Sequence, residues 1–144
     1  MSKPYEKLRT QMTDKSRSAL QLYQHMMVGS ESLIFTIKYE IILGLLDNFP
    51  GALGLFLRQK FYKFLFKSVG KGVVFGRTIT IRHPQKIELG QGVVIADGCV
   101  LDARGDTDNG IVVGENTIIG QGVRLICKSG NIRLGNQVDI GAYS

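Results

Sequence analysis

Two histidines, His25 and His83, are the first candidates for acid–base chemistry, because histidine is the commonest general base near neutral pH. His25 lies in a polar segment that we expect to be helical, and we interpret it as a surface residue. His83 stands in the run Arg82-His83-Pro84-Gln85, where Pro84 cannot join a strand ladder and marks a turn. We therefore expect His83 to be an exposed loop histidine, and the sequence identifies no catalytic residue.

Carboxylates and thiols are the next candidates, for a cation site or a nucleophile. Asp102, Asp106 and Asp108 cluster in LDARGDTDNG, but this run lacks the spacing and the glutamate of an EF-hand, so we interpret it as a polar turn. Cys99 is expected to be a buried apolar residue, and Cys127 has no nearby base to activate it. Glycine motifs that bind phosphate are absent from the sequence. We expect no metal site, and the sequence identifies no cofactor-binding residue.

Composition divides the 144 residues into two unlike halves of one domain-sized chain. Residues 1–72 contain 11 Lys and Arg against 5 Asp and Glu, whereas residues 73–144 contain 7 of each. Fourteen of the 18 glycines occur from Gly70 onward. With 44% hydrophobic residues, two cysteines and no tryptophan, the composition excludes a disordered chain and a disulfide scaffold, and it favours a reducing compartment.

Residues 1–68 are predicted to be a basic helical leader. Helix formers dominate residues 16–28, and this helix should end near Gly29. Ser30 is the expected N-cap of a second helix that continues to about Leu46 and is apolar around most of its circumference. That run is too short and too charged for a membrane span, and nothing here matches a secretory signal. We expect it to pack within protein or to lie in an interface.

A third helix is expected over residues 52–68, and its two faces differ. Placing residues every 100° puts Lys60, Lys63 and Lys67 on one stripe. The adjoining arc is apolar and contains Leu53, Leu57, Phe61, Phe64 and Leu65. Such a helix suits an anionic bilayer surface, although a helix that covers a core with its lysines in water is an equal alternative. Nucleic acid is not an expected partner, since no motif for it occurs.

Residues 69–144 repeat every six positions. Eleven six-residue units (hexads) begin with an aliphatic residue or phenylalanine, at Val69, Phe75, Ile81, Leu89, Ile95, Leu101, Val113, Ile119, Leu125, Leu134 and Ile140. A residue that recurs every six positions can face one way only if the chain turns a corner every six residues. Three hexads therefore make one triangular coil, and stacked coils bury the aliphatic positions.

The hexad pattern, as in Ile119-Gly120-Gln121-Gly122-Val123-Arg124, resembles the hexapeptide-repeat acyltransferases, and the preceding helical segment looks like the leader of some sugar O-acetyltransferase-like members. This resemblance implies a mainly β fold, a left-handed parallel β-helix of residues 69–144 behind the α-helical segment. It also implies a homotrimer that binds acetyl-CoA or another acyl-CoA between neighbouring β-helices, and a histidine base that activates a sugar or glycan hydroxyl. The apolar leader favours a lipid-linked acceptor and a peripheral position on the inner face of the cytoplasmic membrane.

The end of the repeat leads to a further expectation. Ser144 is the fifth residue of a hexad, so its coil is not closed, and neither histidine lies in a late coil. We expect an N-terminal portion of a longer acyltransferase that ends before the catalytic histidine, is inactive alone and associates weakly through its open end. The alternatives are a non-catalytic β-helical scaffold or membrane-docking module, and an acyltransferase that acts on a small soluble amine or amino acid.

Overall fold

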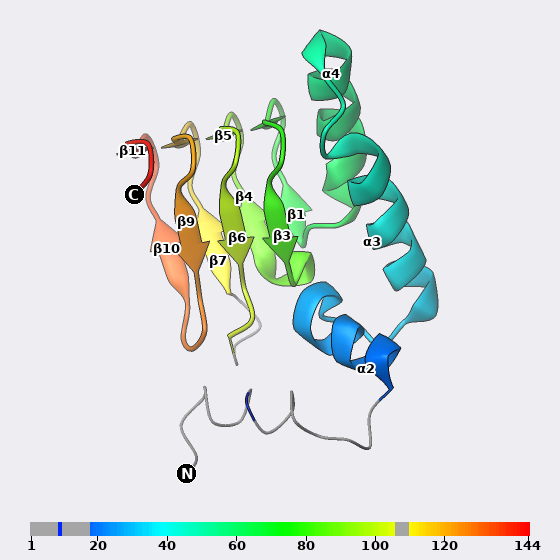
Figure 1. Ribbon diagram of the computed structural model, residues 1–144. Helices are drawn as coiled ribbons and strands as arrows, with labels where there is room; N and C mark the ends of the chain where they lie inside the picture. Colours follow the sequence, from blue (N-terminus) through cyan, green and yellow to red (C-terminus); the bar gives the residue numbers. More distant parts are fainter. Residues whose placement is uncertain (1–8, 10–17, 106–109) are drawn as a thin grey trace.

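A computed structural model describes residues 9, 18–105 and 110–144 (Figure 1). Helices occupy the N-terminal part of the described chain, and eleven short strands follow from Ser68. Every strand pair is parallel, and the strands form three sheets that wind through about three turns. The expected mainly β fold, a parallel β-helix preceded by helices, is confirmed.

Each sheet supplies one side of the solenoid. The first contains β1 (Ser68–Val69), β4 (Ile87–Leu89), β7 (Ile111–Val113) and β10 (Ile132–Leu134). The second contains β2 (Val74–Phe75), β5 (Val94–Ile95), β8 (Ile118–Ile119) and β11 (Asp139–Ile140). The third contains β3 (Thr80–Arg82), β6 (Val100–Asp102) and β9 (Arg124–Ile126). We call them the β1, β2 and β3 sheets.

The strand register stacks the hexad positions on one another. In the β1 sheet Val69 pairs with Leu89, which pairs with Val113 in the next coil. The other two sheets stack their hexad positions in the same way, as Phe75, Ile95, Ile119 and Ile140 and as Ile81, Leu101 and Leu125. These side chains are buried except for Val69, Leu134 and Ile140 at the two ends of the stack, which are partly buried, so stacking creates the core as the period predicts.

The corners between strands explain the excess of glycine. Gly72, Gly92 and Gly122 have φ values near +70°, a conformation that side chains with a Cβ rarely adopt. Gly70 is required for a second reason, since a Cβ there would lie 2.4 Å from the backbone nitrogen of Gln91 in the next coil. The glycines therefore let coils turn and stack closely.

The first two helices begin later than expected. Ser18 caps α2 (Ala19–Tyr23), which continues as a π-helix, η1 (Gln24–Val28), and ends at Gly29 as expected. Residues 16 and 17 lie outside the described part. The prediction of Ser30 as the second N-cap is wrong, because the Ser32 hydroxyl accepts from Phe35 N at the start of α3 (Leu33–Leu46). The hydroxyl of Ser30 instead accepts from Ser32 N and shapes the turn.

The third helix is shorter than expected. α4 spans Gly51–Phe61, a 3-10 turn (η2, Tyr62–Phe64) follows, and Ser68 already belongs to β1. Leu65 of the predicted apolar arc is buried, and it is followed by the buried Phe66, whose ring stacks on Phe75 at 5.4 Å. The helix stops before residue 68 because Leu65 and Phe66, which are neighbours in sequence, are both buried in the core.

The helices cover the end of the solenoid at its first coil (Figure 1). Arg58 of α4, only 1% exposed, joins the two parts: its Nε donates to Phe75 O, and its Nη1 donates to Leu46 O and Phe49 O. Tyr39 of α3 donates its hydroxyl to Ile81 O in the same coil. Among the described helices, none is long and apolar enough to cross a membrane.

Candidate functional site

His83 is not the exposed loop histidine that the sequence predicts. The side chain is 8% exposed and lies at the corner before η3 (Pro84–Lys86), where Pro84 makes the expected turn. Its backbone N–H donates to Met27 O, and its Nε2 lies 2.7 Å from His25 O. The ring packs on Gly29, where a Cβ would come within 2.8 Å of Cγ. His83 therefore connects η1 to the first coil, and the backbone carbonyl of the half-buried His25 is the acceptor for its ring.

The contacts of His83 determine which of its two ring nitrogens is protonated. A carbonyl can only accept, so Nε2 holds the proton, while Nδ1 is buried and has no partner among the described residues. Burial lowers the pKa of His83 below 6.5, helped by Lys86 and opposed by the His25 carbonyl and Asp102. A neutral ring that is largely buried is suited to holding the leader in place rather than to acting as a general base.

This geometry predicts that stability declines in acid. Since the pKa of folded His83 is lower than its unfolded value, the unfolded state takes up the proton more readily, and stability is lost as pH falls below about 6.5. We expect the His83→Asn variant, which tolerates the φ of +53°, to lose this part of the pH dependence. The measurement is denaturant unfolding between pH 5 and 8. Equal pH profiles for the variant and the wild type would contradict the assignment, and His25→Gln provides the control.

Asp102 is not part of a polar turn. It ends β6, is 1% exposed, and pairs with Arg82 at 3.3 Å and Arg104 at 2.7 Å. Asp106 and Asp108 lie outside the described residues. Within the described part, no group of three or more His, Cys, Asp or Glu side chains could hold a metal ion. Asp102 therefore has a structural role in fixing two arginines beside the β3 sheet.

Both cysteines are buried free thiols, as expected for Cys99. Cys99 donates to Gly120 O, and Cys127 to Gly130 O. Burial raises the pKa of both thiols, which disfavours the reactive thiolate. Neither cysteine is a candidate nucleophile.

Five large apolar side chains of α3 are exposed. Four of them, spaced four residues apart, form a row on one side of the helix: Leu33, Ile37, Ile41 and Leu45. Ile34 lies beside this row. Tyr39, on the other side of α3, binds the first coil, so this row faces away from the solenoid. We call these five residues the α3 apolar row. Sequence reasoning missed it, although the spacing of four was there to be found.

The three lysines of the predicted stripe separate in the structure. Lys60 lies in the last turn of α4 and Lys63 lies in η2, but Lys67 follows the last helical turn, so the stripe does not continue. Lys60 and Lys63 lie over the rings of Phe61 and Phe64, at 5.7 and 5.4 Å from their centroids. All three are exposed, and the sequence has no acidic residue from 48 to 87.

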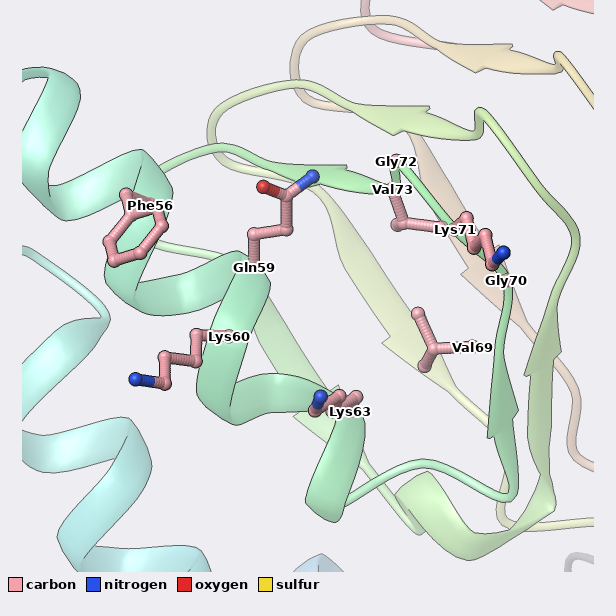
Figure 2. A pocket seen from close by; sticks show the side chains of 9 residues that line it. All are labelled: Phe56, Gln59, Lys60, Lys63, Val69, Gly70, Lys71, Gly72 and Val73. Atoms are coloured by element: carbon pink, nitrogen blue, oxygen red, sulfur yellow. The ribbon is translucent and has the colours of Figure 1, made fainter.

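An open cavity of about 440 Å³ lies between α4 and the first coil. Figure 2 shows Gln59 and Val69 facing this space, with Lys60 on the helix side and Lys71 on the coil side. Phe56, Lys63, Gly70, Gly72 and Val73 complete the lining. The lining contains three lysines and no carboxylate. We call it the α4–coil pocket.

A second apolar feature follows the outside of the β2 sheet. Val74, Val94 and Ile118 pair in successive strands and point outward, and the last member of this column is Asp139. The neighbouring hollow, of about 270 Å³, is lined by Leu55, Val94 and Gln121 among others. The outward rows of the other two sheets contain charged residues, including Glu88, Arg133, Arg82 and Arg124. The β2 sheet therefore has the most apolar outer face.

Comparisons with protein-family models, curated proteins and solved structures found no match for this chain.

Proposed function

We propose that this chain belongs to an acyl-CoA-dependent acyltransferase that works at a membrane surface, with a sugar or lipid-linked glycan hydroxyl as acceptor. The observation that supports the proposal most strongly is the register: all three sheets stack the hexad positions that the resemblance to hexapeptide-repeat acyltransferases rests on. The enclosed His83 is not proposed as the base, and no catalytic residue is assigned.

Assembly is the second part of the proposal. In the proteins that the hexads resemble, the acyl-CoA lies between neighbouring β-helices, so a donor site needs at least two copies. The column of Val74, Val94 and Ile118 is the face best suited to such packing, because it is apolar and partly exposed, with Ile118 at 45%. We propose a homotrimer that packs through the β2 sheet.

Membrane docking is the third part. The α3 apolar row is unpartnered among the described residues, and the neighbouring α4 and η2 carry lysines without a nearby acidic residue in sequence. Apolar side chains beside lysines suit an anionic bilayer, where the side chains enter the interface and the lysines meet the lipid phosphates. Free buried thiols agree with the cytoplasmic side. Binding should strengthen with anionic lipid and weaken with salt.

Titration of the full chain with acetyl-CoA tests the enzyme class. We expect saturable binding of acetyl-CoA and none of acetate, because the nucleotide part supplies most of the contact area. The α3 apolar row also favours a second candidate, a membrane-docking module without catalysis. Vesicle binding without any acetyl-CoA binding would support that module and contradict the acyltransferase.

The assembly face gives a separate prediction. Replacing Val94 and Ile118 together by lysine should weaken self-association at least about 100-fold, because two charges would have to be buried in the packed face. Both side chains point outward, so the fold should persist by circular dichroism. Sedimentation equilibrium measures the effect. The double substitution Val112→Lys and Ile126→Lys, on the other two sheets, is the matched control, and an equal effect of both pairs would contradict the assignment.

A further inference from the structure

The α4–coil pocket contains the backbone N–H of Gly72, whose counterparts in the later coils all donate hydrogen bonds within the solenoid. In each later coil, the corresponding corner N–H donates to the coil before it: Gly92 to Lys71 O, Asn116 to Gln91 O and Gln137 to Glu115 O, at 2.8 to 2.9 Å. Gly72 holds this corner in the first coil, where no coil precedes it. None of the described residues accepts from Gly72 N. Its N–H therefore faces the side where α4 and the pocket lie.

Three lysines line the pocket that contains this donor. Lys60, Lys63 and Lys71 line the same pocket, and no described carboxylate forms an ion pair with any of them. The nearest acidic residue along the first coil's sheet is Glu88, which pairs with Ser68 outside the lining. Lysine ammonium groups and an unpaired N–H at a glycine corner are the donors that phosphate oxygens accept from.

The surroundings of the pocket favour a phospholipid headgroup over free phosphate as the ligand. Phe56 and Val69 give the pocket an apolar part, and Lys38 of α3 lies over the ring of Phe64, the residue after Lys63, at 5.6 Å, so η2 contacts α3. A ligand with phosphate and acyl chains satisfies both features. The geometry points to the α4–coil pocket as a binding site for the phosphate headgroup of an anionic phospholipid, held by Gly72 N, Lys63 and Lys71. This inference rests on the proposed membrane docking.

Nuclear magnetic resonance of the full chain tests the pocket without a membrane. Short-chain dihexanoyl-phosphatidylglycerol, below its micelle concentration, should shift the Gly72 amide resonance, and inorganic phosphate at equal ionic strength should do so at least about 10-fold more weakly. An unmoved Gly72 amide would overturn the site. Equal affinities for inorganic phosphate and for the short-chain lipid would contradict the proposal that the ligand is a phospholipid.

Vesicle co-sedimentation provides the second arm. Lys63→Gln with Lys71→Gln should weaken binding to phosphatidylglycerol vesicles by about 30-fold. Gln59→Glu, which adds one carboxylate to the pocket, should also weaken it, whereas Gln137→Glu, at an exposed corner of the last coil, should not. Wild-type binding by the pocket variants would overturn the site and leave membrane docking standing. If the wild type binds no vesicle, docking is wrong, and the Gly72 amide alone decides the pocket.

Discussion

Replacing Arg58 by methionine is expected to lower the free energy of unfolding by about 3 to 5 kcal/mol, the largest single-residue effect in the molecule. The guanidinium is buried and donates to three carbonyls, two near the end of α3 and one in β2. Methionine fills most of the volume, but it leaves these carbonyls without donors in a closed site. Gly54 packs so closely here that a Cβ would lie 3.1 Å from Arg58 Nη1, so little rearrangement is available.

Denaturant unfolding measures this loss of stability, and two further variants test whether it comes from the hydrogen bonds of Arg58. Arg58→Lys keeps the charge but cannot reach all three acceptors, so it should fall between methionine and the wild type. Arg77→Met removes an exposed arginine that binds Asn48 Oδ1 at 2.8 Å, and it should cost less than about 1 kcal/mol. An Arg58→Met protein within about 1 kcal/mol of the wild type would show that the helices do not depend on this contact.

Changing Ile37 and Ile41 together to aspartate is expected to reduce vesicle binding at least about 100-fold. Both are at the centre of the α3 apolar row and are 50% and 53% exposed, so the fold loses little packing. In a bilayer interface the same positions would have to bury two carboxylates. Co-sedimentation with vesicles that contain phosphatidylglycerol measures the loss.

A matched pair of substitutions separates insertion from a general effect of charge. Ile126→Asp with Tyr143→Asp removes two exposed apolar side chains and adds two charges at the end of the solenoid far from the helices. This control should bind vesicles nearly as well as the wild type. If both double variants bind equally, the α3 apolar row does not enter the bilayer.

The solenoid could be predicted from the sequence almost residue by residue. Its core positions recur at a fixed period, and the pairing of Val69 with Leu89, or of Ile95 with Ile119, follows from counting hexads. Repetition makes each local interaction predict the next, because one coil contacts only its neighbours. Cys99 was identified as buried for the same reason, since it stands at the small fifth position of its hexad.

The helical half could not be predicted in this way, because its geometry depends on single contacts between distant residues. His83 is enclosed by η1, more than fifty residues earlier in the chain, so its flanking sequence gives no sign of burial. α4 ends early because Leu65 and Phe66 enter the core, which separates Lys67 from the other lysines. The unpaired N–H of Gly72 arises only from being in the first coil, although its hexad resembles the others.

The most direct test of the whole account is whether the protein brings an acyl donor to a membrane. Radiolabelled acetyl-CoA, the full chain and phosphatidylglycerol vesicles are mixed and sedimented together. We expect the label to pellet with the wild type, and to stay in the supernatant with Ile37→Asp/Ile41→Asp and with Val94→Lys/Ile118→Lys. Wild-type protein that pellets without the label would contradict the proposal that this solenoid serves acyl transfer at the bilayer.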